Sequence, residues 1–150
     1  MEVGVYRCRG GGELAALRGL LVKTLASGRR AFVQTAPEVL DALDRELWLG
    51  GEGNFLPHGK LGDENGERQP VLLTDAVDLG GGIVNGAEYY FRYLFGGGGF
   101  PGAGSFARGF VIVGEGGEFD SGELGGDYRV SWWRQETGGG WRRESESGGK

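Results

Sequence analysis

Strand-like and helix-like patterns alternate over the first 48 residues, and this alternation restricts the possible folds more than any other feature. Residues 2–8 alternate valines with other side chains, as a β-strand does. In residues 13–28 leucines recur at helical spacing, and a glycine stands where a helix would end. Residues 30–35 form a second β-favouring run, and residues 37–48 a second helical pattern that begins with proline. This βαβα order is typical of α/β folds with parallel strands joined by right-handed crossovers.

Five further segments favour strands. The last two are separated by a Thr-Gly-Gly-Gly sequence, which favours a hairpin. Before the first of the five segments, residues 50–69 are rich in Gly, Asn, Asp and Glu and predict a long surface loop. We therefore expect one α/β domain over residues 1–150, with a mostly parallel, mixed sheet that ends in a C-terminal hairpin. The five segments are residues 70–74, 88–95, 106–113, 128–134 and 140–144.

Glycine is unusually frequent, at 34 of 150 residues, and most of it lies in the second half of the chain. Four prolines and the lack of a three-residue period exclude a collagen helix. Residues 118–126 fall where the alternation calls for a helix, but each glycine there costs about 1 kcal/mol relative to alanine. The sequence therefore disfavours a helix in this segment.

The charge balance points to a protein partner. With 16 basic and 21 acidic side chains the net charge is -5, which argues against a protein held on duplex DNA by phosphate contacts. Cys8 is the only cysteine, so no internal disulfide and no cysteine-based zinc site can form. The N-terminal residues lack the pattern of a signal peptide, and no 18 consecutive residues are apolar. We expect a cytoplasmic protein that makes no membrane contact.

One motif suggests a cofactor. The spacing of Gly10, Gly12 and Ala15 between a strand and a helix fits the G-x-G-x-x-A pattern of dinucleotide-binding turns. The acidic residue that this pattern requires at the end of the second strand is missing. His58 is the only histidine, and no catalytic or metal-binding pattern accompanies it. We expect no catalytic site, cofactor or metal, and a small nucleotide-binding enzyme that uses the Gly10–Ala15 turn is the alternative.

Two groups of aromatic residues are candidates for binding. Trp48 at the end of the second helix and Phe55 in the polar segment after it are typical of a protein-binding hot spot, although Trp48 could also belong to the core. The second group interleaves tryptophan with arginine near the C-terminus, which suits base stacking, binding of an acidic peptide, or a plain hairpin. This group consists of Trp132, Trp133, Arg134, Trp141, Arg142 and Arg143.

Several segments together resemble the chi subunit of bacterial DNA polymerase III holoenzyme, in order and in spacing. The most specific is Leu-Trp at 47–48 followed by Phe-Leu-Pro-His at 55–58. The resemblance extends over most of the chain. It also includes residues 21–35, 43–48, 54–59, 69–74 and 85–88, and the terminal Val-Ser-Trp-Trp-Arg-Gln with the later Gly-Trp.

This resemblance implies a Rossmann-like, three-layer α/β domain with no enzymatic site and no bound nucleotide. Chi subunits belong to the clamp loader, where they bind the psi subunit and the acidic, phenylalanine-ended tail of single-stranded-DNA-binding protein. The resemblance places Trp48 and Phe55 on the psi-facing surface, with His58 nearby. It therefore implies a non-catalytic accessory subunit that bridges two proteins in DNA replication and meets DNA only indirectly.

The tail-binding surface transfers less directly from the family. It lies around the end of the strand that ends at Val113 and the helix after it, where basic side chains hold the tail. Here that segment carries Glu115, Glu118, Asp120 and Glu123, so no residue of the helix can be carried over. Because like charges repel the tail, we expect weaker binding that depends on arginines of the flanking strands. These are Arg108, Arg134 and above all Arg129, whose strand the α/β order could place beside residues 106–113.

Overall fold

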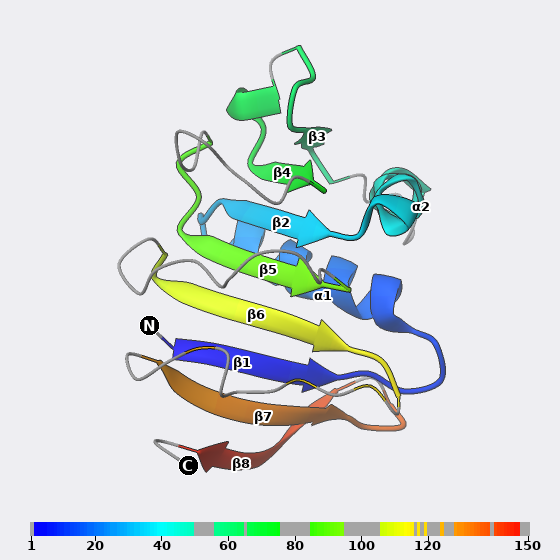
Figure 1. The fold of residues 1–150 in the computed structure, drawn as a ribbon, viewed down its shortest axis with the longest axis vertical. Coiled ribbons are helices and arrows are strands. Elements are labelled where there is room, and N and C mark those ends of the chain that lie inside the picture. Colours follow the sequence, from blue (N-terminus) through cyan, green and yellow to red (C-terminus); the bar gives the residue numbers. More distant parts are fainter. Residues whose placement is uncertain are drawn as a thin grey trace.

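The computed structural model describes residues 2–49, 56–64, 66–75, 85–94, 106–115, 117, 119, 124, 128–138 and 140–147. Helices and strands alternate in its first part, and strands follow (Figure 1). The elements are β1 (Glu2–Arg7), α1 (Glu13–Ala26), β2 (Ala31–Thr35), α2 (Pro37–Leu49), β3 (His58–Lys60), the short 3-10 helix η1 (Gly66–Arg68), β4 (Val71–Thr74), β5 (Tyr89–Tyr93), β6 (Arg108–Val113), β7 (Arg129–Gln135) and β8 (Trp141–Ser147).

All eight strands belong to one sheet, in the order β3-β4-β2-β5-β6-β1-β7-β8. Every neighbouring pair is parallel except β7 and β8, which form the antiparallel pair at one edge. The predicted α/β class, the mostly parallel sheet and the C-terminal hairpin are therefore confirmed.

Two faces of the sheet carry separate apolar clusters. Alternate strand residues, such as Val33, Leu73 and Phe91, pack with the leucines of α1 and α2 into the largest cluster. Both described helices thus cover this first face, and α1 lies behind the sheet in Figure 1. The opposite, second face holds two smaller clusters, one around Val5 and Val111. Neither described helix forms the third layer expected over it.

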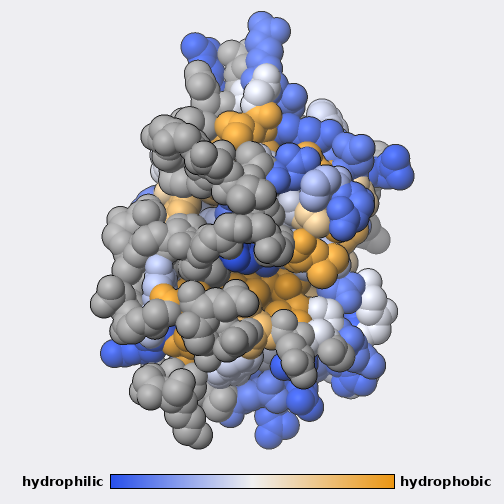
Figure 2. All heavy atoms as spheres, viewed as in Figure 1, coloured by the Kyte–Doolittle hydropathy of each residue, from blue (hydrophilic) through white to orange (hydrophobic). Residues whose placement is uncertain are grey.

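Figure 2 views the second face. Apolar residues occupy its middle, and hydrophilic residues lie both at the β7–β8 end and toward β3 and α2.

The structure corrects the expectation that residues 50–69 form only a surface loop. Residues 58–60 pair with β4 as the short edge strand β3, and residues 66–68 form η1. Three residues are too few to show strand alternation, so the pattern is invisible in the sequence. Tertiary contacts hold the segment, because Leu56 and His58 are buried.

The structure also corrects the expected neighbourhood of β7. β1, and not β7, lies beside β6, and β7 pairs with the other edge of β1. Most of residues 118–126, where the sequence disfavours a helix, lie outside the described residues, as does Phe55. No helix in the described ranges is long and apolar enough to span a membrane.

Candidate partner-binding surfaces

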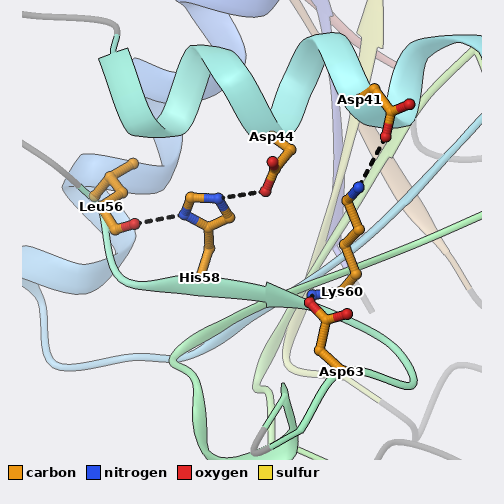
Figure 3. Close-up of polar contacts among 6 residues, drawn as sticks. All are labelled: Asp41, Asp44, Leu56, His58, Lys60 and Asp63. Carbon is orange, nitrogen blue, oxygen red and sulfur yellow. Dashed lines mark hydrogen bonds and ion pairs between the residues drawn. The ribbon is translucent and has the colours of Figure 1, made fainter.

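The first candidate, named here the α2–β3 surface, consists of Asp41, Asp44 and Trp48 on α2 and Lys60 on β3, with His58 of β3 beneath them (Figure 3 shows the polar contacts). Trp48 is 54% exposed at the end of α2, although Leu47 beside it is fully buried. Its ring meets the His58 ring edge-on, with 5.4 Å between centroids. An exposed tryptophan that packs against a buried side chain is typical of the residues that dominate binding energy at protein interfaces.

His58 lies beneath this surface and not on it. Its side chain is 1% exposed, and its two ring nitrogens contact Leu56 O at 2.6 Å and Asp44 Oδ1 at 2.7 Å. Through these two contacts His58 ties the segment before β3 to α2.

Two further contacts fix β3 against α2. Lys60 Nζ lies 2.8 Å from Asp41 Oδ1, and this hydrogen bond lowers the pKa of Asp41 and raises the pKa of Lys60. The Asp41 carboxylate is mostly exposed, so the pair adds little stability. Closer to the helix end, Leu56 N donates to Leu47 O at 3.2 Å, which brings together the two ends of residues 48–55.

The second candidate, named here the arginine pocket, lies where the parallel strands end. Arg7, Cys8, Arg9, Glu115 and Arg134 line a cavity of about 410 Å³. Ligands of α/β proteins bind in this position, beyond the carboxyl ends of the strands.

The strand register explains which side chains meet there. Arg7 is the register partner of Val113 on one side and of Arg134 on the other. Side chains two residues apart in a strand point to the same face. Each of these three residues stands two positions after an apolar residue of the second face, so Arg7, Val113 and Arg134 belong to that face as well.

Among the described residues, Arg7 and Arg9 have uncharged hydrogen-bond acceptors, and Arg134 has a carboxylate partner. Arg7 donates to Gly117 O at 3.0 Å and Arg9 to Thr137 Oγ1 at 3.2 Å, both uncharged acceptors. Arg134 Nε lies 3.1 Å from Glu144 Oε2, with the arginine side chain 60% exposed. The pocket is lined by three arginines and one glutamate, so it carries excess positive charge and suits an anionic group.

Glu115, the remaining charged residue of the arginine pocket, contacts the β1–α1 turn. Its Oε2 accepts from Gly10 N at 2.9 Å, and Gly10 and Gly11 both have positive φ. Glu13 adds another carboxylate in the first turn of α1. A phosphate at this turn would therefore meet two carboxylates, one of them already bonded to a turn amide.

The structure does not bring Arg129 to Val113. Arg129 begins β7, where its register partner is Glu2, and the register places Glu2 beside Arg108 at the start of β6. Arg134, the next-to-last residue of β7, lies five residues, or about 17 Å, further along the strand.

Arg7 and Arg9 are the site residues that sequence reasoning missed. The first strand was well defined, so the rule that ligands bind beyond strand ends would have singled out both. The order of the strands, which puts Val113 beside them, has no signature in the sequence. No three His, Cys, Asp or Glu residues within the described ranges are grouped to hold a metal ion.

The chain thus has an α/β fold that presents one surface with an exposed tryptophan and one pocket lined by arginines. Residues 2–94, which run from β1 through β5, match the family model described as DNA polymerase III chi subunit, HolC. This is more than half of the chain, so the chain belongs to the chi subunit family. No curated protein matches the sequence. The matched region contains the α2–β3 surface and ends before β6.

Proposed function

We propose that this chain is a non-catalytic adaptor of the clamp loader, acting in the cytoplasm. In this proposal it binds the psi subunit through the α2–β3 surface and the acidic tail of single-stranded-DNA-binding protein through the arginine pocket. The observation that carries the proposal is the exposed Trp48, held by buried His58 within the part of the chain that matches the family.

The psi-facing role rests on Trp48 and Phe55. Trp48 offers a large exposed ring, and Phe55 stays a proposal from the sequence because it lies outside the described residues. His58 is too buried to touch a partner, so its role is to position the surface.

The tail-binding role moves from Arg129 to Arg7 and Arg134. Arg7 lies between Val113 and Arg134 in the register, whereas Arg129 lies at the opposite end of β7. Arginine forks bind carboxylates in pairs of hydrogen bonds, and an acidic tail supplies several carboxylates. Glu115 in the same pocket opposes the tail, which keeps the expectation of weak binding.

The alternative of a nucleotide-binding enzyme receives less support. The turn that would hold a phosphate has its Gly10 amide bonded to Glu115, and Glu13 lies in the first turn of the helix that follows. Both carboxylates repel phosphate.

Titration calorimetry with purified psi and with a tail peptide tests the proposal. Trp48→Ala should weaken psi binding by about 2 kcal/mol or more without changing tail binding. Arg134→Gln should weaken tail binding at least several-fold, and Arg129→Gln, the matched control on the same strand, should not. If Arg129→Gln alone reduces tail binding, or if nucleotides bind and psi does not, the proposal is wrong.

A further inference from the structure

The C-terminal tryptophan and arginine motif lies on the β7–β8 hairpin, at one edge of the sheet (Figure 1). Trp133 and Trp141 pack against Tyr6 on the first face, at centroid distances of 5.9 and 5.0 Å. Because neighbouring residues of a strand alternate between faces, Arg134 and its register partner Arg142 share the second face. The proposed function uses Arg134, but it gives no role to Arg142 or to the carboxylate that pairs with Arg134.

Three arginines stand side by side on this second face. Arg134 has Arg7 as its register partner on β1 and Arg142 as its register partner on β8, so one cation lies on each of three adjacent strands. We call these three residues the arginine row, and Arg9 adds a further cation to the same pocket. Like charges at directly opposite positions of a sheet repel each other. Within the described part of the chain, Glu144 is the carboxylate that pairs with the row.

A β-bulge in β8 positions this carboxylate. Arg143 of β8 pairs with Trp133 of β7. The neighbouring residue of β7, Trp132, pairs with Ser145, so Glu144 is an extra residue of β8 without a register partner. Bulges redirect a side chain and are over-represented beside functional sites. The bulge therefore sets the place of the Glu144 side chain at the end of the arginine row.

The Glu144 carboxylate occupies one approach to Arg134 and leaves the others open. Its Oε2 lies 3.1 Å from Arg134 Nε, and the side chains are 33% and 60% exposed, so a carboxylate from solution can reach the same guanidinium. Glu115, the acidic residue that lines the arginine pocket, is held elsewhere, because its Oε2 accepts from Gly10 N in the β1–α1 turn. Glu144 is thus the internal carboxylate that an anionic ligand meets at Arg134.

We propose that Glu144 is a built-in competitor for the anionic ligand of the arginine pocket. With no ligand bound, its carboxylate balances part of the positive charge of the arginine row. An acidic peptide has to displace this carboxylate before it can use the whole fork of Arg134. The exchange lowers the affinity for the peptide and reduces repulsion within the row of the unliganded chain. This inference rests on the proposed function, because it takes the arginine pocket as the site of the acidic tail, and it adds the residue that limits binding there.

Fluorescence anisotropy of the full chain with a labelled hexapeptide of five aspartates and a C-terminal phenylalanine tests the inference. Glu144→Gln keeps the size of the side chain and removes its charge. It should tighten peptide binding about two- to fivefold, the strength of one exposed ion pair. The same variant should melt a few degrees lower, because the arginine row loses its carboxylate. Glu136→Gln, which removes an exposed carboxylate from the turn of the same hairpin, is the matched control and should change peptide affinity less than about twofold.

A double-mutant cycle separates direct competition from general repulsion of the acidic peptide. In an Arg134→Gln background Glu144 has no Arg134 guanidinium to occupy, so the further change Glu144→Gln should leave the peptide affinity within about twofold. If Glu144 only repelled the peptide through solvent, its removal would tighten binding equally in both backgrounds. That result would overturn the inference.

The remaining outcomes distinguish this inference from the proposed function. If Arg134→Gln weakens peptide binding and Glu144→Gln does not tighten it, the inference is wrong, whereas the arginine pocket still holds the peptide. If the parent chain does not bind the peptide, or if Arg134→Gln leaves its affinity unchanged, both are wrong, because Glu144 then has no ligand to compete with. A lower melting temperature of Glu144→Gln with unchanged affinity would reduce Glu144 to a structural role.

Discussion

At the scale of single residues, the buried polar groups of this protein hold its surfaces in place. His58 is the main example, since both of its ring nitrogens are hydrogen-bonded beneath Trp48. The sequence pointed to His58 by resemblance as part of a binding surface, and in the structure its side chain is buried. Burial of a lone histidine in a polar segment could not be predicted, because it depends on the pairing of β3 with β4.

Replacing His58 with alanine should therefore destabilise the fold. The change removes two hydrogen bonds from a buried site and leaves Leu56 O without its donor, so we expect a loss of about 2–3 kcal/mol in the free energy of unfolding. Urea denaturation measures it. Lys60→Gln, which breaks the exposed pair with Asp41, should cost less than about 1 kcal/mol. Equal losses in the two variants would contradict this account of His58.

Buried Tyr90 makes stability depend on alkaline pH. Burial raises the pKa of Tyr90 from 10.0 to about 12, against the opposing effect of Arg92. Above pH 10 the unfolded chain releases this proton before the folded chain does, so stability falls as pH rises from 10 to 12. The pKa of Cys8 is also raised to about 12 by burial, which adds to the same loss from pH 9 upward. Thermal unfolding at several pH values should show the decline, and Tyr90→Phe should make it shallower. A decline as steep in Tyr90→Phe would exclude Tyr90 as its source.

At the scale of elements, the sequence predicts the helices, whose apolar pattern repeats over several turns. It does not predict the short strand or the strand order, which depend on tertiary contacts. Both helices were predicted close to their observed bounds because their leucine spacing extends over several turns. β3 was missed because it has three residues, and the place of β1 between β6 and β7 was missed because strand order depends on crossovers between distant segments. For the same reason the sequence could not show that Arg134 lies beside Arg7 and Arg9.

The two glycines of the first helical segment provide a matched pair. A Cβ on Gly19, inside α1, would meet nothing within 4 Å, so Gly19→Ala should gain about 1 kcal/mol of helix stability. Gly28 follows the helix with a φ of +80°, a conformation that alanine rarely adopts. Gly28→Ala should therefore lower stability by about 1 kcal/mol. Denaturant midpoints measure both, and a change of the same sign in the two variants would contradict the assigned helix end.

At the scale of the whole molecule, the order of the strands separates the two surfaces of the proposed function. β3 is the first strand of the sheet and β1 the sixth, so five strand spacings, or about 24 Å, lie between the α2–β3 surface and the arginine pocket. The two surfaces also differ in character, one centred on a tryptophan and the other on arginines. In the proposed function, the two partners therefore do not compete for the same side chains.

The net charge of -5 leads to a further expectation for the whole chain. Oligonucleotides should bind only weakly, and any affinity should disappear as salt rises, because few phosphates can be neutralised. Anisotropy titration with a labelled single strand at increasing salt measures this. Submicromolar binding in physiological salt would show that the chain contacts DNA directly.

The central claim is that one copy of this chain joins two proteins, and sedimentation velocity of a three-component mixture tests it most directly. The chain, the psi subunit and a labelled tail peptide are mixed at concentrations above both dissociation constants. We expect a single boundary in which the label moves with the psi complex. Addition of psi should leave the affinity for the peptide unchanged, because the two surfaces lie at separate places on the sheet. Release of the label when psi is added, or a chain that binds neither component, would contradict the account.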